Sequence, residues 1–164
     1  MILKSLGTAI AALILVTISA PVPVAKAQSN AADETAIKKV VPDFNTCFNS
    51  KNAHACAMLF AEDGELTTVR GDIFSGRSDL EKHYQTVFTT FLKDAHRTDT
   101  FKSVRFLTPT IASVDAAWKM TGATSPNGTE VAPPVREGIF TWILTKHDGR
   151  WYITIFHELD FPGK

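Results

Sequence analysis

The stretch 135–162 constrains the fold more than any other part of the chain, because it reads as two long strands joined by a tight turn. Residues 138–146 alternate in polarity and are rich in β-branched and aromatic side chains, which favours a strand. Both faces of this strand carry apolar residues, so we expect it to be central, with something packed on each side. Asp148 and Gly149 predict the turn, since glycine accepts a positive φ.

The preceding chain predicts three amphipathic helices and three further strands. The predicted helices cover residues 33–50, 52–60 and 78–91, and the predicted strands cover residues 65–70, 100–107 and 110–121. Ser78 and Glu81 form a capping box at the start of the third helix. This order predicts an α+β domain, in which a curved, mostly antiparallel sheet wraps around the long third helix and an N-terminal helix pair precedes them. A pocket is expected between sheet and helix.

The N-terminus has the pattern of a secretory signal peptide. Lys4 is followed by an apolar run over residues 6–20, and Ala25-Lys26-Ala27 supplies a small-residue cleavage site. A membrane anchor is the alternative, but the run is shorter than the ~20 residues that a span needs.

We therefore expect residues 1–27 to be removed and residues 28–164 to form a single domain. The mature protein would be exported, to the periplasm or the extracellular space, with no membrane contact after cleavage.

The net charge and the cysteine content indicate which binding partners and which cellular compartment the sequence favours. The chain has 17 Lys and Arg against 17 Asp and Glu, so its balance gives no support for nucleic-acid binding. Cys47 and Cys56 lie near the facing ends of two predicted helices, and an even pair in an oxidising compartment favours a disulfide. Two buried free thiols are the alternative.

Several short motifs carry a resemblance to a known superfamily. They are Leu59-Phe60-Ala61-Glu62-Asp63-Gly64, Gly71, Gly76-Arg77, Phe140-Thr141-Trp142, Asp148-Gly149-Arg150-Trp151 and His157. With the order of elements, they resemble the nuclear transport factor 2-like superfamily, and within it the SnoaL-like and SgcJ/EcaC-type proteins, which are related to ketosteroid isomerase. The resemblance implies a cone-shaped fold with a cavity at its wide end, and a homodimer packed through the sheet. The superfamily hosts isomerases, dehydratases, cyclases and binding proteins, so it does not name an activity.

Three residues are candidates for acid/base chemistry, each with a structural alternative. His157 is expected on the same face of the last strand as Trp151, inside the cavity, or else as a rim residue bonded to a backbone carbonyl. His83 lies on the apolar side of the third helix, where it could pair with His157 or simply be a satisfied core residue. Glu137 could act as a base at the pocket mouth, or lie exposed at a strand end.

Other residues are candidates for ligand binding. The candidates for the cavity wall are Trp118, Trp142, Tyr84 and Phe88, with the core as the alternative place for the two tryptophans and the dimer face as a further one for Trp142. Arg70 could bind an anionic group by charge-assisted hydrogen bonds, or lie solvated at the surface. No metal site is expected, because the five histidines lack metal-ligand spacing. No cofactor is expected, because a Gly-rich dinucleotide turn is absent from the sequence.

Two functions follow as hypotheses. The first is an exported protein that binds a small hydrophobic molecule in its cavity. The second is a cofactor-independent isomerase or dehydratase that uses His157 with His83 or Glu137. A module that only dimerises or binds another protein is a third alternative.

Overall fold

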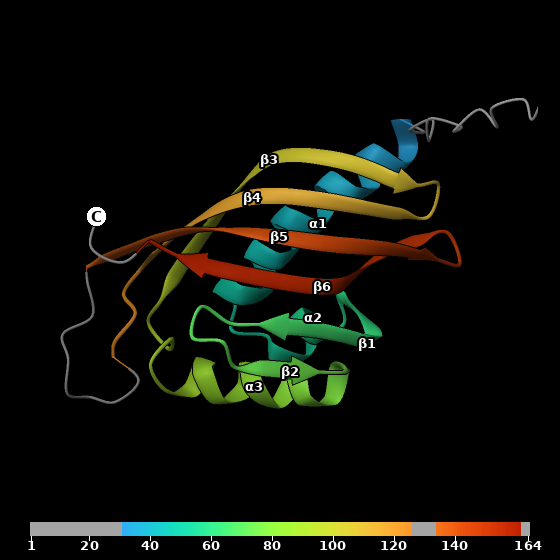
Figure 1. Ribbon diagram of the computed structural model, residues 1–164. Coiled ribbons are helices and arrows are strands. Elements are labelled where there is room, and N and C mark those ends of the chain that lie inside the picture. The colour runs from blue at the N-terminus through green and yellow to red at the C-terminus, as the bar shows by residue number, and fades with distance from the viewer. Residues whose placement is uncertain (1–30, 126–133, 162–164) are drawn as a thin grey trace, which may run out of the picture.

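The computed structural model describes residues 31–125 and 134–161 as an α+β fold (Figure 1). Its elements are α1 (Ala31–Asn49), α2 (Ala53–Ala57), β1 (Phe60–Thr67), β2 (Ile73–Ser75), α3 (Arg77–Thr89), β3 (His96–Thr108), β4 (Ile111–Thr121), β5 (Val135–His147) and β6 (Arg150–Asp160). The predicted fold class is confirmed, and the short strand β2 is an element that the sequence pattern did not predict. The predicted signal segment, residues 1–27, lies outside the described residues and stays a prediction.

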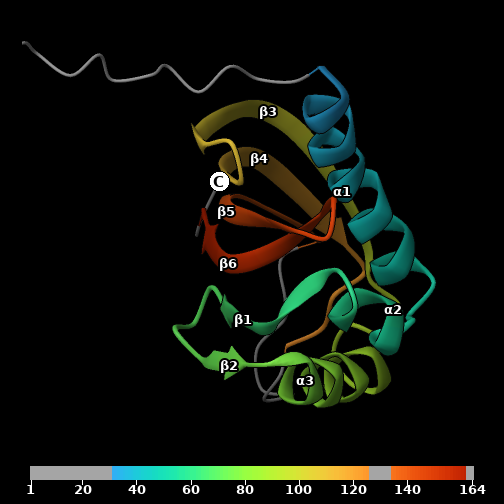
Figure 2. The ribbon, with the colours of Figure 1, turned by 90° about the vertical axis from the view of Figure 1, so that its right-hand side faces the viewer.

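The six strands form one curved, open sheet in the order β2-β1-β6-β5-β4-β3. Strands β3 to β6 form an antiparallel meander, and β1 joins it by parallel pairing with β6. Figure 2 shows the three helices on one side of the sheet, with α1 beside β3 and α3 near β2. No helix among the described residues is both long and apolar enough to span a membrane.

Alternation along β5 places its even-numbered residues in the core and its odd-numbered residues outside. Phe140 and Trp142 are buried against Phe44 of α1 and Phe156 of β6. Ile139 lies on the outer face and is 42% exposed. The expectation that both faces of this strand are covered is therefore wrong for the single chain, in which the helices cover only the inner face.

Two asparagines of α1 bind the open edge of the sheet. Asn49 accepts a hydrogen bond from the backbone N–H of Arg97 and donates one to its carbonyl, both at 2.8 Å. Asn45, one helical turn earlier, makes the same pair of contacts with the backbone of Asp99, at 2.9 and 3.3 Å. At Arg97 and Asp99 the open backbone groups of the edge strand β3 are thus satisfied by a helix, which fixes the positions of these two residues.

The two N-terminal helices are joined by a disulfide between Cys47 and Cys56, whose Cα atoms lie 5.3 Å apart. Asn52 caps α2, as predicted, by accepting a hydrogen bond from the N–H of Ala55. The predicted capping box of α3 is wrong. This helix begins one residue earlier, at Arg77, directly after β2, and its N-cap is Gly76 with a φ of 80° and no side-chain cap.

Candidate functional site

A cavity of about 230 Å³ lies between the inner face of the sheet and the helices α1 and α3. Most of its wall is apolar or aromatic, and it includes residues of both helices, of strands β1, β3, β4, β5 and β6, and of the segment after β4. Its lining residues include Phe44, Val69, Arg70, His83, Tyr84, Arg97, Trp118, Arg136, Phe156 and Glu158. Concave sites lined mainly by apolar and aromatic side chains are typical of small-molecule binding.

A bulge in β6 decides which residues of the last strand face the cavity. Ile143 pairs with Ile155 whereas Leu144 pairs with Ile153, so Thr154 is an extra residue in β6. An extra residue shifts the alternation by one position. Before the bulge the odd-numbered residues face inward, and after it the even-numbered residues do.

The predicted cavity position of His157 is therefore wrong. It pairs with Thr141 of β5 and Thr67 of β1, and it lies exposed on the outer face. Glu158 and Phe156 take the inward positions and line the cavity. The sequence-based prediction assumed unbroken alternation from Trp151 onward, and the bulge breaks it.

The other two acid/base candidates lie in different places. Glu137 is exposed on the outer face, where it pairs with Lys119 at 3.3 Å, so it does not lie at the pocket mouth. His83 does line the cavity, and its ring lies 4.0 Å from that of Phe74. Burial lowers the pKa of His83 to about 4, so its imidazole is neutral at pH 7.

The ligand-binding candidates divide in the same way. Trp118, Tyr84 and Arg70 line the cavity. Trp142 is fully buried in the core beside Phe140, and Phe88 packs against Phe48 and Tyr84. Neither Trp142 nor Phe88 is part of the described cavity wall, so both contribute to the core that supports it.

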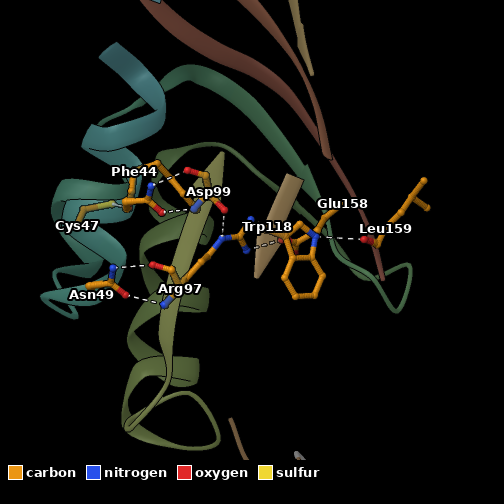
Figure 3. A network of polar contacts seen from close by, with 9 residues as sticks. Phe44, Cys47, Asn49, Arg97, Asp99, Trp118, Glu158 and Leu159 are labelled. Carbon is orange, nitrogen blue, oxygen red and sulfur yellow. Dashed lines mark hydrogen bonds and ion pairs between the residues drawn. The ribbon is translucent and has the colours of Figure 1, made fainter. Parts of the chain in front are cut away.

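The most unusual feature of the site is a buried guanidinium held between two carboxylates (Figure 3). Arg97 is 2% exposed, and its Nε donates to Asp99 Oδ1 at 2.7 Å. Its Nη1 donates to Glu158, which lies on β6 and also lines the cavity. The guanidinium carbon also lies 5.3 Å from the ring centroids of Phe44 and Trp118, close enough for cation–π attraction.

The environment shifts the pKa values of this group of residues. Burial raises the pKa of Asp99 to about 6, although the charge of Arg97 acts in the opposite direction. Burial alone would lower the pKa of Arg97, but Asp99 and Glu158 together outweigh it, so the guanidinium stays charged. Burial and the nearby Glu158 charge raise the pKa of Tyr84, so its hydroxyl stays protonated.

Two donors in the cavity wall have no hydrogen-bond partner within the described part of the chain. They are Tyr84 Oη and Arg97 Nη2. Asp99 Oδ2 and Trp142 Nε1 also lack partners there, but these residues do not line the cavity. Such atoms are uncommon in folded proteins, and both of these atoms are buried.

The sequence-based prediction missed Arg97, Asp99 and Glu158. The signal that could have found the first two is their spacing, since residues two apart on a strand share a face, and an Arg and an Asp on an inward face must pair. The predicted strand began at residue 100 and excluded them. Among the described residues, no group of three or more His, Cys, Asp or Glu side chains is placed to hold a metal ion.

Residues 29–157 match the SnoaL-like domain, which is most of the chain. This chain belongs to the SnoaL-like domain family. The family places it in the nuclear transport factor 2-like superfamily, as the sequence motifs predicted. The narrower likeness to SgcJ/EcaC-type proteins stays a prediction. No curated protein matches the chain.

Three solved structures illustrate the fold that this SnoaL-like chain shares. A domain of unknown function with a cystatin-like fold from Nostoc punctiforme is 22% identical, with 82% of this chain and 81% of that one covered and a TM-score of 0.71. A protein proposed to be a scytalone dehydratase from Novosphingobium aromaticivorans is 19% identical, with 79% and 85% covered and a TM-score of 0.66. A ketosteroid isomerase-like protein from Erwinia carotovora atroseptica is 18% identical, with 82% and 100% covered and a TM-score of 0.67. At these identities the likeness establishes the fold alone.

Proposed function

We propose that this SnoaL-like protein binds a small, mainly apolar molecule in its cavity, and that it does so after export. The observation that carries the proposal is the cavity of about 230 Å³, whose wall is made mostly of apolar and aromatic side chains. We also propose, from the superfamily resemblance, that the outer face of the sheet pairs with a second copy. Exposed apolar side chains on that face support this pairing, among them Ile139 and Leu159, which is 60% exposed.

Blocking the cavity should abolish ligand binding. Val69 lines the cavity and is only partly buried. Val69→Trp should therefore place an indole in the cavity without displacing the side chains of the core. A probe such as cumene, at ten times its Kd, should raise the Tm of the wild type by roughly 3–6 °C. A thermal-unfolding assay should show no such rise for Val69→Trp.

The matched control is Ile73→Trp, because Ile73 is exposed on β2 and does not line the cavity. This variant should respond to the probe as the wild type does. An equal response from all three proteins would show that the probe binds elsewhere, and the proposal would then be wrong.

Acid/base catalysis is the second candidate function, and the Asp99–Arg97–Glu158 arrangement favours it. Two carboxyl groups share one guanidinium, and burial raises the pKa of Asp99 toward neutrality. Groups held in this way are common in sites that transfer protons. In this proposal Glu158, which lines the cavity, takes the role that the sequence analysis gave to His157, and His83 is a neutral neighbour. The reaction would be of isomerase or dehydratase type and would need no cofactor.

The raised pKa of Asp99 has a measurable consequence. An unfolded Asp ionises near pH 3.9, whereas Asp99 in the folded protein ionises near pH 6. Between these values the folded state holds the extra proton, so the contribution of Asp99 to the free energy of unfolding should fall as pH rises from about 4 to about 6.

Carbon-13 NMR of protein labelled at the Asp side-chain carboxyls should show one resonance that titrates near pH 6 and is absent in Asp99→Asn. A spectrum in which every Asp has ionised by pH 5 would contradict the pKa, and the acid/base proposal would lose its physical basis.

A further inference from the structure

The outer face of the sheet, which the helices leave uncovered, carries a row of polar side chains that crosses five strands (Figure 2). The row consists of Ser103 on β3, Asp115 on β4, Thr141 on β5, His157 on β6 and Thr67 on β1, each paired with the next. We infer that pairing of two copies through this face is controlled by pH, through reciprocal contacts between Asp115 of one copy and His157 of the other. The inference rests on the proposed pairing and specifies its geometry and its regulation.

Within one chain, Asp115 and His157 are too far apart to form an ion pair. They lie two strands apart with Thr141 between them, and neighbouring strands are about 4.8 Å apart, so roughly 10 Å separates them. Asp115 accepts hydrogen bonds from Thr141 at 2.8 Å and from Ser103 at 3.0 Å. Both Asp115 and His157 are exposed, and within the described residues neither has a partner of opposite charge.

A two-fold axis along β5 brings these two residues together. Two copies that pack face to face, with this axis between their sheets, place β4 of each copy over β6 of the other. The polar row keeps its level, so Asp115 of each copy faces His157 of the other. Facing sheets pack about 10 Å apart, a gap that an aspartate and a histidine side chain span together. An axis across the strands would instead place each of these residues opposite its own counterpart.

The sizes of the flanking side chains favour the same axis. On either side of the row, β6 carries the large Ile155 and Leu159, and β4 carries the small Ser113 and Ala117 at the same two levels. With the axis along β5, each large side chain faces a small one. The other axis sets large against large and leaves a gap between the small ones. Leu159 is 60% exposed in the single chain, so the contact would remove apolar surface from water.

The charged residues around the row agree with this arrangement. Arg105 on β3 and Glu65 on β1 lie at one level, two residues along the strands from the row. The axis along β5 sets Arg105 of each copy opposite Glu65 of the other, again with opposite charges. Lys102 lies in a bulge of the edge strand β3, and Lys119 and Glu137 pair with each other at 3.3 Å further along the strands.

The charge of His157 makes the pairing depend on pH. A histidine gains its positive charge as the pH falls from about 8 to about 5.5, whereas an exposed aspartate stays ionised over this range. The two reciprocal contacts are therefore ion pairs at pH 5.5 and lose their attraction at pH 8. The other histidines of the sheet, His96 and His147, lie at the ends of β3 and β5, away from the row.

Sedimentation equilibrium at the two pH values tests the pH dependence. The dissociation constant of the wild-type dimer should be about tenfold smaller, or less still, at pH 5.5 than at pH 8. Asp115→Asn keeps an oxygen for the hydrogen bond from Thr141 but should abolish this difference. The exchanged variant, Asp115→His with His157→Asp, should restore the difference, because the axis then brings the same two groups together. His147→Gln is the matched control and should behave as the wild type.

Cross-linking tests the axis independently of pH. The two native cysteines form a disulfide, so a new cysteine supplies the single free thiol of the chain. Ile139 and Ile143 lie on β5, on either side of Thr141. With the axis along β5, a short bismaleimide should join each of Ile139→Cys and Ile143→Cys to its own counterpart. An axis across the strands would allow this for at most one of the two variants.

Two results would overturn the inference while leaving the proposed pairing intact. One is a dimer whose dissociation constant is equal at the two pH values, or changes as much in Asp115→Asn as in the wild type. The other is a dimer in which Ile139→Cys or Ile143→Cys does not cross-link. If the protein sediments as a monomer at both pH values, the pairing itself is wrong, and the inference falls with it. Ligand binding in the cavity, tested with Val69→Trp, depends on none of these results.

Discussion

Replacing Arg97 with methionine should lower the free energy of unfolding by about 3–5 kcal/mol at pH 7.5. Methionine fills most of the same space, but it leaves Asp99 and Glu158 without the cation that both contact. Breaking a buried ion pair by removing one partner is strongly destabilising, because the remaining charge has neither water nor a partner. Urea unfolding followed by tryptophan fluorescence measures the loss.

The pH dependence separates this cause from a packing defect. Without Arg97, the pKa of Asp99 should rise further above 6, because the cation that opposes the effect of burial is gone. Asp99 is largely protonated at pH 5 in both proteins. Above pH 6 the folded variant holds a proton that the wild type has lost, so its free energy of unfolding falls faster as pH rises, and the loss of stability should be smaller at pH 5 than at pH 7.5. A packing defect would cost the same at both pH values.

Two controls complete the experiment. Arg136→Met removes a partly exposed arginine paired with Asp160, and it should cost no more than about 1 kcal/mol. Adding Asp99→Asn and Glu158→Gln to Arg97→Met should recover much of the stability, since neutral amides are cheaper to bury than unpaired carboxylates. A triple variant no more stable than Arg97→Met would show that the charges are not the reason for the loss.

The fold could be predicted from the sequence because its main signals are local and repeated. Alternation over residues 138–146 and apolar spacing in the helices both extend over many residues, so small errors at their ends do not change the fold class. The boundary errors came from tertiary contacts. Strand β3 begins at His96, four residues before the prediction, because Asn45 and Asn49 of α1 supply partners for its edge.

The candidate site was harder to predict because one residue changes which face is buried. His157 and Glu158 are neighbours, and only the bulge at Thr154 decides that the carboxylate lies inside and the imidazole outside. The register of β6 shifts against both of its neighbours, β5 and β1, and a single sequence does not reveal such a shift. For His83, on a regular helix, periodicity predicted the apolar side of the helix, and in the structure that side places it in the cavity wall.

Gly138→Ala should destabilise the protein by about 3 kcal/mol or more and disturb the cavity wall. Gly138 lies on the inner face of β5, paired with Trp118 of β4. The indole leans across this glycine and donates a hydrogen bond to the carbonyl of Leu159 on β6, at 3.1 Å. A Cβ at position 138 would lie 1.9 Å from that carbonyl oxygen and 2.6 Å from the indole, so the ring or the backbone must move.

Because Trp118 lines the cavity, displacement of its ring should also weaken the binding of small apolar probes. Gly71→Ala is the control, since Gly71 has a φ of 84° but no atom near its would-be Cβ, and the change should cost only about 1 kcal/mol from backbone strain. The contact with the indole can be isolated in a double-mutant cycle with Trp118→Leu, which removes the ring. If the clash is the cause, Gly138→Ala should cost clearly less in the Trp118→Leu background, and an unchanged cost would mean that Gly138 is required by the backbone of β6 alone.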